Sequence, residues 1–213
     1  HVLIILQNRW QAAALHWACL LLGLIISPVN WRATPDELKY FAENADARAL
    51  FYESVSDEAV QRAGLMEAIP CVGVGVPDAR HPYRELFQSA TPITAPRARP
   101  DDISVMLYTS GTTGRPKGVP RRHYQERAAA VAHVAQNIYH RAERTLGVMP
   151  LYHTMGVRSM ISMVLINGLF VCQPRFNAKE ALEAIRDWKL TNLYLVPTLY
   201  HDLIHSPEFS RAS

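Results

Sequence analysis

The residues with the clearest potential for chemistry form one short stretch near the middle of the 213-residue chain. The stretch joins hydroxyl side chains, glycines and a lysine, in the order Thr109, Ser110, Gly111, Thr112, Thr113, Gly114, Arg115, Pro116, Lys117 and Gly118. Hydroxyl and backbone N–H groups can donate hydrogen bonds to phosphate oxygens, and the lysine adds a positive charge. Glycine allows positive φ and a close approach of the backbone to a ligand. We therefore predict a phosphate-binding loop in which Gly111, Gly114 and Gly118 supply this freedom.

The spacing of this loop differs from that of a Walker P-loop. In the Walker pattern four residues separate two glycines, and the lysine follows the second glycine directly. Here Gly111 and Gly114 are three positions apart, and two residues intervene before Lys117. The alternative interpretation is a solvent-exposed Ser/Thr/Gly linker that binds nothing. The apolar, strand-like run at 103–108 argues against it, because linkers rarely lie between strand-like runs.

At ten nearly consecutive positions the stretch resembles the phosphate-loop signature of the adenylate-forming enzymes. This superfamily includes acyl- and aryl-CoA ligases, firefly-type luciferases and the adenylation domains of peptide synthetases. Residues 147–156, Gly-Val-Met-Pro-Leu-Tyr-His-Thr-Met-Gly, resemble a second signature, in which a strand delivers an aromatic–histidine pair into the active site. Residues 195–198 resemble a third. The sequence from 150 to 156 is most similar to ligases for benzoate-like acids, such as the chlorobenzoate–CoA ligases.

The resemblance implies a two-step reaction. A carboxylate attacks the α-phosphorus of ATP to give an acyl-adenylate and pyrophosphate, and the thiol of CoA then displaces AMP. The implied ligands are ATP, Mg²⁺ and CoA, with a small carboxylic acid as the substrate. A carboxylate is a poor nucleophile toward a highly charged electrophile, so catalysis depends on positioning and on neutralisation of charge.

The same resemblance assigns roles to individual residues. It places the β- and γ-phosphates of ATP on Thr109, Ser110, Gly111, Thr112, Thr113 and Gly114, with Thr113 also at the metal ion. It makes Lys117 and His153 catalytic, with His153 between the acyl carboxylate and the phosphates. It lines the acyl pocket with His153, Met155, Ala130, Val131 and Val196. The alternatives are a surface lysine that only tethers the loop, a core histidine, and pocket residues that are ordinary core.

The composition is that of a globular protein, with 49% hydrophobic and 19% charged residues. The net charge of +3 and the absence of a Lys/Arg block predict no nucleic-acid partner. The apolar window 12–26 is too short for a membrane span. Three widely spaced cysteines, Cys19, Cys71 and Cys172, predict buried free thiols in a reducing compartment. We therefore expect a cytoplasmic protein, bound to no membrane, that can form a homodimer.

Strand-like runs alternate with helical patterns along the chain, which predicts an α/β fold with largely parallel sheets flanked by helices. The expected strands are 1–6, 24–29, 49–52, 69–76, 103–108, 144–149, 169–173 and 192–196. The expected helices are 10–22, 35–45, 56–63, 124–139, 159–167 and 178–188, with a last one from 197. Thr34 with Glu37 predicts a capping box, and Asn177 with Glu180 predicts a second helix start.

Three segments describe the expected domain organisation. Residues 1–89 form part of a first α/β subdomain, 90–101 a Pro-rich linker, and 102–213 part of a second subdomain with the phosphate loop. The later motifs of the superfamily, including Tyr-Gly-x-Thr-Glu, Thr-Gly-Asp and the lysine of a small C-terminal domain, are absent. We therefore expect a partial N-terminal domain of a ligase, inactive by itself. A noncatalytic phosphate- or acid-binding remnant and an adenylation domain of the luciferase or peptide-synthetase type are the alternatives.

Overall fold

The computed structural model describes residues 1–88, 92–93, 95–109 and 115–209. The chain divides into two compact units, one of His1–Leu6 with Ala14–Tyr124 and one of Gln7–Ala13 with Gln125–Ser213. We call them unit 1 and unit 2 and describe each by itself. The division does not fall at the Pro-rich segment 90–101. Strand β6 (Ile103–Thr109) follows that segment, yet it pairs with a strand near the start of the chain.

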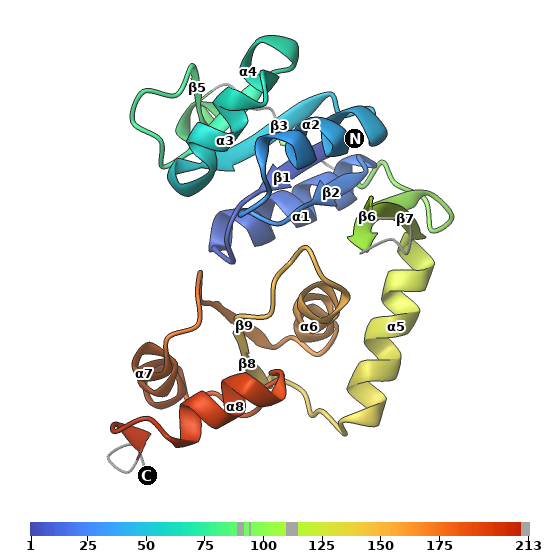
Figure 1. Ribbon diagram of the computed structural model, residues 1–213. Helices are drawn as coiled ribbons and strands as arrows, with labels where there is room; N and C mark the ends of the chain where they lie inside the picture. The colour runs from blue at the N-terminus through green and yellow to red at the C-terminus, as the bar shows by residue number, and fades with distance from the viewer. Residues whose placement is uncertain (89–91, 94, 110–114, 210–213) are drawn as a thin grey trace. The chain divides into compact units, whose positions relative to one another are not determined.

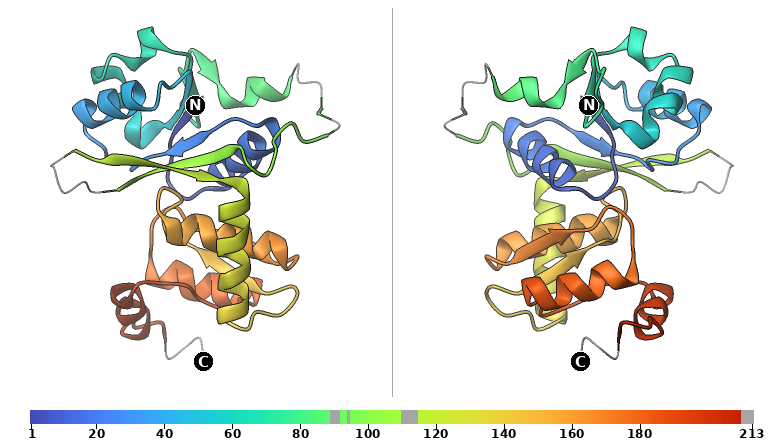
Figure 2. Two further views of the ribbon diagram at one scale, coloured as in Figure 1. Left: turned by 90° about the vertical axis from the view of Figure 1, so that its right-hand side faces the viewer. Right: turned by 90° about the vertical axis from the view of Figure 1, so that its left-hand side faces the viewer.

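Unit 1 is built on one sheet with the strand order β5-β4-β3-β1-β2-β6-β7. Its other strands are β1 (Val2–Ile5), β2 (Ile26–Pro28), β3 (Ala49–Glu53), β4 (Cys71–Val74), β5 (His81–Pro82) and β7 (Lys117–Arg122). All neighbours are parallel except β6 and β7, which run antiparallel as a two-stranded ribbon (Figure 2). The predicted parallel sheet is therefore confirmed, whereas β7 was not foreseen.

Helices cover both faces of this sheet, with α1 (Trp10–Leu22) on one side and α2 (Pro35–Asn44) and α3 (Asp57–Arg62) on the other (Figure 1). The remaining helical segments of unit 1 are the 3₁₀ turns η1 (Ser54–Ser56) and η2 (Tyr83–Phe87) and the short α4 (Leu65–Ala68). The side of α2 and α3 holds a buried cluster that includes Leu3, Leu38, Leu50 and Val60. Placing successive crossover helices on opposite faces gives a doubly wound sheet.

Local sequence determines where several helices begin and end. The Thr34 hydroxyl accepts a hydrogen bond from the Glu37 amide at 3.3 Å, and the Glu37 carboxylate accepts one from the Thr34 amide at 2.8 Å, so the predicted capping box is confirmed. The Asn177 side chain accepts from the Glu180 amide at 3.0 Å and starts α7 (Ala178–Trp188) as predicted. Gly23 directly follows α1 and has φ of +72°, a conformation that favours glycine.

Unit 2 has a short parallel pair, β8 (Arg144–Gly147) and β9 (Leu169–Cys172). Its helices are α5 (His123–Gln136), α6 (Thr154–Leu165), α7 and α8 (Pro197–Ile204), with the first residues of α5 belonging to unit 1. The predicted strand 192–196 is wrong, because only Asn192 forms a single bridge, to Thr145. The segment packs by its side chains instead: Leu195 is buried, and the Tyr194 ring lies 4.5 Å from the ring of His133.

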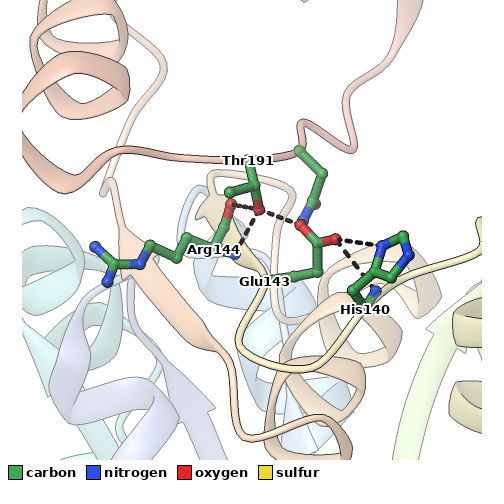
Figure 3. A network of polar contacts seen from close by, with 5 residues as sticks. His140, Glu143, Arg144 and Thr191 are labelled. Carbon is green, nitrogen blue, oxygen red and sulfur yellow. Dashed lines mark hydrogen bonds and ion pairs between the residues drawn. The ribbon is translucent and has the colours of Figure 1, made fainter.

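A polar network anchors this segment at the start of β8 (Figure 3). The Glu143 carboxylate accepts hydrogen bonds from the Thr191 hydroxyl, from Asn192 Nδ2 at 3.4 Å and from the His140 amide at 3.2 Å. The Arg144 amide donates to the Thr191 hydroxyl at 2.8 Å, and the Thr191 amide donates to the Arg144 carbonyl at 2.9 Å. The hydrogen bond from Thr191 is the main reason that the pKa of Glu143 is lowered.

Cysteine burial follows the sequence prediction in part. Cys19 and Cys71 are buried and Cys172 is half-buried, and all three are free thiols. Burial raises the pKa of Cys19 to about 12 and those of Cys71 and Cys172 to about 11. The thiols are therefore protonated at neutral pH, which makes them poor nucleophiles. Within the described residues, every helix is too short or too polar to span a membrane.

Candidate functional site

The β6–β7 hairpin brings the two ends of the predicted phosphate loop together. Thr109, the last residue of β6, lies directly opposite Lys117, the first residue of β7. Directly opposite residues of an antiparallel pair project to the same face, with Cβ atoms about 4.5–5.5 Å apart. Both side chains are exposed. The predicted phosphate ligands Ser110, Gly111, Thr112, Thr113 and Gly114 lie outside the described residues.

Gly118 corrects one detail of the sequence prediction. It is part of β7, opposite Tyr108, and it is not among the residues with positive φ. A strand ladder requires extended backbone, so the freedom of positive φ is not used here. A Cβ at this position would lie 2.7 Å from Met106 Sδ, so glycine instead leaves room for the Met106 side chain.

Helix α2 holds this end of the hairpin through two residues that the sequence analysis missed. The Tyr40 hydroxyl donates to the Pro116 carbonyl at 2.8 Å, and the Tyr108 hydroxyl donates to Asn44 Oδ1 at 2.9 Å. Burial, followed by the nearby Tyr40, raises the pKa of Tyr108 to about 12, so its hydroxyl remains a donor at neutral pH. The i, i+4 spacing of Tyr40 and Asn44 was the only signal in the sequence, since it places both on one face of the helix.

These tethers bear on the role of Lys117. The Tyr40 and Tyr108 hydroxyls fix the hairpin to α2, whereas the Lys117 ammonium makes no hydrogen bond or ion pair with any described residue. Arg115 also contributes, because its guanidinium lies 5.6 Å from the centre of the Tyr40 ring. Whether Lys117 binds phosphate or only tethers the loop stays a prediction.

The second part of the site is the segment that joins β8 to α6 in unit 2 and carries His153. His153 is the N-cap residue of α6, but its side chain makes no capping hydrogen bond. The imidazole is exposed and lies 4.6 Å from the ring of Tyr152, so His153 is not a core histidine. Desolvation by the neighbouring protein lowers the pKa of His153. The ring is consequently mostly neutral at pH 7 and can both donate and accept a hydrogen bond.

Two residues pack closely against this segment. The buried side chain of Asn8 donates to the Gly147 and Met149 carbonyls, and it accepts from the Leu151 amide. Gly156, in the first turn of α6, packs so closely that a Cβ there would lie 2.4 Å from the Met149 carbonyl oxygen. The sequence analysis did not single out Asn8, because its partners are far away along the chain.

The residues predicted to line the acyl pocket all belong to unit 2, whereas Thr109 and Lys117 belong to unit 1. Met155 is half-buried, in the first turn of the helix that His153 caps. Ala130 is fully buried on α5, where its carbonyl accepts from the Ser162 hydroxyl of α6 at 3.3 Å, while Val131 is 47% exposed. Val196 is the half-buried N-cap residue of α8. Helices α5 and α6 thus bring Ala130 and the helix of His153 together, and Val196 comes from a separate element.

The described residues contain no group of three or more His, Cys, Asp or Glu side chains that could hold a metal ion. The predicted metal ligand Thr113 lies outside them. A Mg²⁺ ion bound mainly through nucleotide phosphates needs only one or two protein ligands, so this finding is compatible with it.

A family model and two curated relatives match the chain. The family model for AMP-binding enzymes matches residues 1–213. The sulfoacetate–CoA ligase of Cupriavidus necator is 31% identical over 213 aligned residues, which cover 97% of this chain and 41% of the relative. The 2-succinylbenzoate–CoA ligase of Bacillus licheniformis is 29% identical over 197 residues, which cover 92% of this chain and 39% of that protein.

A solved structure shows the same fold. The inhibitor-bound N-terminal domain of FACL13 from Mycobacterium tuberculosis superposes with a TM-score of 0.88 at 22% identity, covering 100% of this chain and 53% of that one. The chain spans about two fifths of the length of the curated relatives described above. A match over every residue of the sequence shows the family, and the chain belongs to the AMP-binding enzymes.

Proposed function

We propose that the full-length protein is an AMP-forming carboxylic acid:CoA ligase. It activates a carboxylate as an acyl-adenylate with release of pyrophosphate, and then transfers the acyl group to the thiol of CoA with release of AMP. The observation that carries this proposal is the exposed Lys117 ammonium, directly across the hairpin from Thr109 and without a described partner. In an AMP-binding enzyme, a cation at the base of a hydroxyl-rich loop suits the phosphates of ATP.

Each group has a proposed task. The loop from Thr109 to Gly114 holds the β- and γ-phosphates, and Lys117 offsets their charge. Thr113 would be a protein ligand of Mg²⁺, which would supply further positive charge at the phosphates. The His153 imidazole lies beside the incoming carboxylate and donates a hydrogen bond that orients it. All of these contributions are positioning and electrostatic, as transfer at a phosphorus atom demands.

The choice of CoA as the acceptor rests on the relatives, two of which are CoA ligases by name. Their acids, sulfoacetate and 2-succinylbenzoate, differ in size and aromaticity, so we propose only a small carboxylic acid. Met155, Val131, Ala130 and Val196 remain the proposed lining of its pocket. A luciferase-type or peptide-synthetase-type adenylation domain would share the first half-reaction, and formation of a CoA thioester separates these functions. The predicted cytoplasmic location and homodimer stay predictions.

Replacing Lys117 by alanine tests the proposal. We expect the full-length protein to catalyse acid-dependent exchange of pyrophosphate into ATP, tested with acetate, benzoate, sulfoacetate and 2-succinylbenzoate. Lys117→Ala removes a charge-assisted contact to phosphate, so the exchange rate should fall about tenfold while the melting temperature stays unchanged. Lys39→Ala, at an exposed lysine of α2, is the matched control and should behave as the wild type.

Two results would contradict parts of this proposal separately. A full-length protein that binds ATP but exchanges no pyrophosphate with any of these acids would favour the noncatalytic remnant. If the wild type is active and Lys117→Ala has the same exchange kinetics, the proposed ligase function stands. The proposed role of Lys117 at the phosphates is then wrong.

A further inference from the structure

We propose that Asn8 is a positioning residue for His153, because its side-chain amide fixes the segment Gly147–Leu151 that carries the histidine. The inference rests on the proposed function, which gives His153 its task at the carboxylate. Asn8 itself touches neither the imidazole nor a reacting group in this proposal. It acts only through the backbone that leads to His153.

The contacts of Asn8 use its whole amide group. Nδ2 donates to the Gly147 carbonyl at 3.1 Å and to the Met149 carbonyl at 2.6 Å, and Oδ1 accepts from the Leu151 amide at 3.0 Å. The side chain is only 4% exposed. One buried amide therefore binds every second residue of a five-residue segment that lies about 140 positions later in the chain.

This segment needs such a partner because of where it runs. Strand β8 ends at Gly147, so the residues that follow have no ladder to satisfy their backbone groups. Val148, Met149 and Leu151 are nevertheless buried. A buried backbone group without a hydrogen bond costs about 1–3 kcal/mol. Asn8 supplies a donor to the Met149 carbonyl and an acceptor to the Leu151 amide, where a neighbouring strand would otherwise supply them. Its second donor adds to the Gly147 carbonyl, which also accepts from the Gln173 amide at 3.2 Å.

The effect of Asn8 reaches His153 through the first turn of α6. The His153 amide donates to the Pro150 carbonyl at 3.0 Å, and Gly156 packs against the Pro150 and Met149 carbonyls. The Met149 carbonyl thus lies between the Asn8 amide and the start of α6. Moving that carbonyl moves the start of the helix, and with it the imidazole.

Asparagine is the side chain that fits these partners. Aspartate has no N–H to donate and would place a buried negative charge beside two carbonyl oxygens. Leucine has a similar shape but makes none of the three hydrogen bonds. Alanine removes the amide and leaves all three backbone groups without this partner, and serine keeps one hydroxyl on a shorter side chain.

A double-mutant cycle on the full-length protein separates positioning from general stabilisation. The variants are Asn8→Ala, His153→Ala and the double variant, assayed by pyrophosphate exchange with the acid that supports the fastest exchange among those named above. We expect Asn8→Ala to lower kcat about tenfold with little change in the KM for ATP. In the His153→Ala background the same substitution should change kcat less than twofold, because its effect passes through the imidazole. Additive losses would overturn the inference.

Three further variants serve as controls for the double-mutant cycle. Asn8→Ser, a milder change, should give a smaller loss in the same direction and keeps the test valid if Asn8→Ala fails to fold. Asn137→Ala removes an exposed asparagine of unit 2 whose side chain bonds only locally to His133, and it should not alter kcat. Val60→Ala, a core truncation in α3 of unit 1, lowers stability in a cluster that includes no residue of this segment and should give additive losses with His153→Ala.

A second readout does not depend on activity. In NMR titrations of the His153 ring, Asn8→Ala should move its pKa up toward that of a free histidine, because a displaced ring leaves the neighbouring protein groups that desolvate it. An unchanged titration and an unchanged chemical shift would overturn the inference even in an active enzyme. If His153→Ala leaves exchange unaffected while Asn8→Ala still shifts the titration, the proposed task of His153 fails and the positioning by Asn8 stands.

Discussion

Gly156→Ala should open the start of α6 and lower the stability of unit 2 by about 3 kcal/mol. The added Cβ would lie 2.2 Å from the Pro150 carbonyl oxygen and 2.4 Å from that of Met149. Both obstacles are backbone atoms, so no side-chain rotation relieves the overlap, and overpacking of this kind costs about 1–3 kcal/mol or more. Alanine gains about 1 kcal/mol over glycine in a helix, which is too little to compensate.

The loss should be confined to one part of the molecule. Hydrogen exchange of the full-length protein should show weaker protection of the amides of α6, with β1 and β3 of unit 1 unchanged. Gly64→Ala is the control, because a Cβ there would meet nothing within 4 Å and only the φ of +70° opposes it. That variant should lose about 1–2 kcal/mol, in unit 1 alone. Wild-type protection of α6 in Gly156→Ala would contradict the expected close contact.

Local patterns in the sequence predicted the features that depend on near neighbours. The capping box of Thr34 and the start of α7 at Asn177 involve residues three positions apart, and both are present. The parallel sheet of unit 1 followed from alternating strands and helices, and it too is present. The phosphate loop itself stays a prediction between its described ends, Thr109 and Lys117.

The features that the sequence did not predict depend on distant or competing contacts. Strand β7 is polar and contains Pro120, which is tolerated because β7 lies at the edge of the sheet. The segment 193–196 has a strand-like sequence, but Tyr194 packs on His133 and Leu195 enters the core of unit 2. Asn8 was not predicted as a functional residue, because its partners lie about 140 positions later in the chain.

Acidification should destabilise unit 1 through His16. This histidine of α1 is 1% exposed, and its Nε2 has no hydrogen-bond partner among the described residues. Burial, and next the nearby His123, lower the pKa of His16 to about 4. His123 is itself half-buried with a lowered pKa, and Asp102 only partly offsets that shift. The pair therefore resists protonation in the folded protein.

The direction of the pH dependence follows from the two states of His16. Above pH 6.5 the ring is neutral in both the folded and the unfolded chain, so the full stability is present. Between pH 6.5 and about 4, His16 is protonated in the unfolded chain but stays neutral in the folded protein. The free energy of unfolding therefore falls as the pH falls. This difference in the pKa of His16 between the two states corresponds to about 3 kcal/mol in the free energy of unfolding. The loss of stability levels off below pH 4.

Urea unfolding of the full-length protein between pH 4 and pH 7.5 measures this loss. His16→Leu should keep or raise the stability at pH 7, because it removes an unpaired polar atom from the core, and it should flatten the acid slope. Some slope should remain, since the pKa values of His123, His133 and His153 are also lowered. His81→Leu, at an exposed histidine of unit 1, should leave the slope unchanged. An equal slope in His16→Leu and wild type would mean that protonated His16 is accommodated in the folded state.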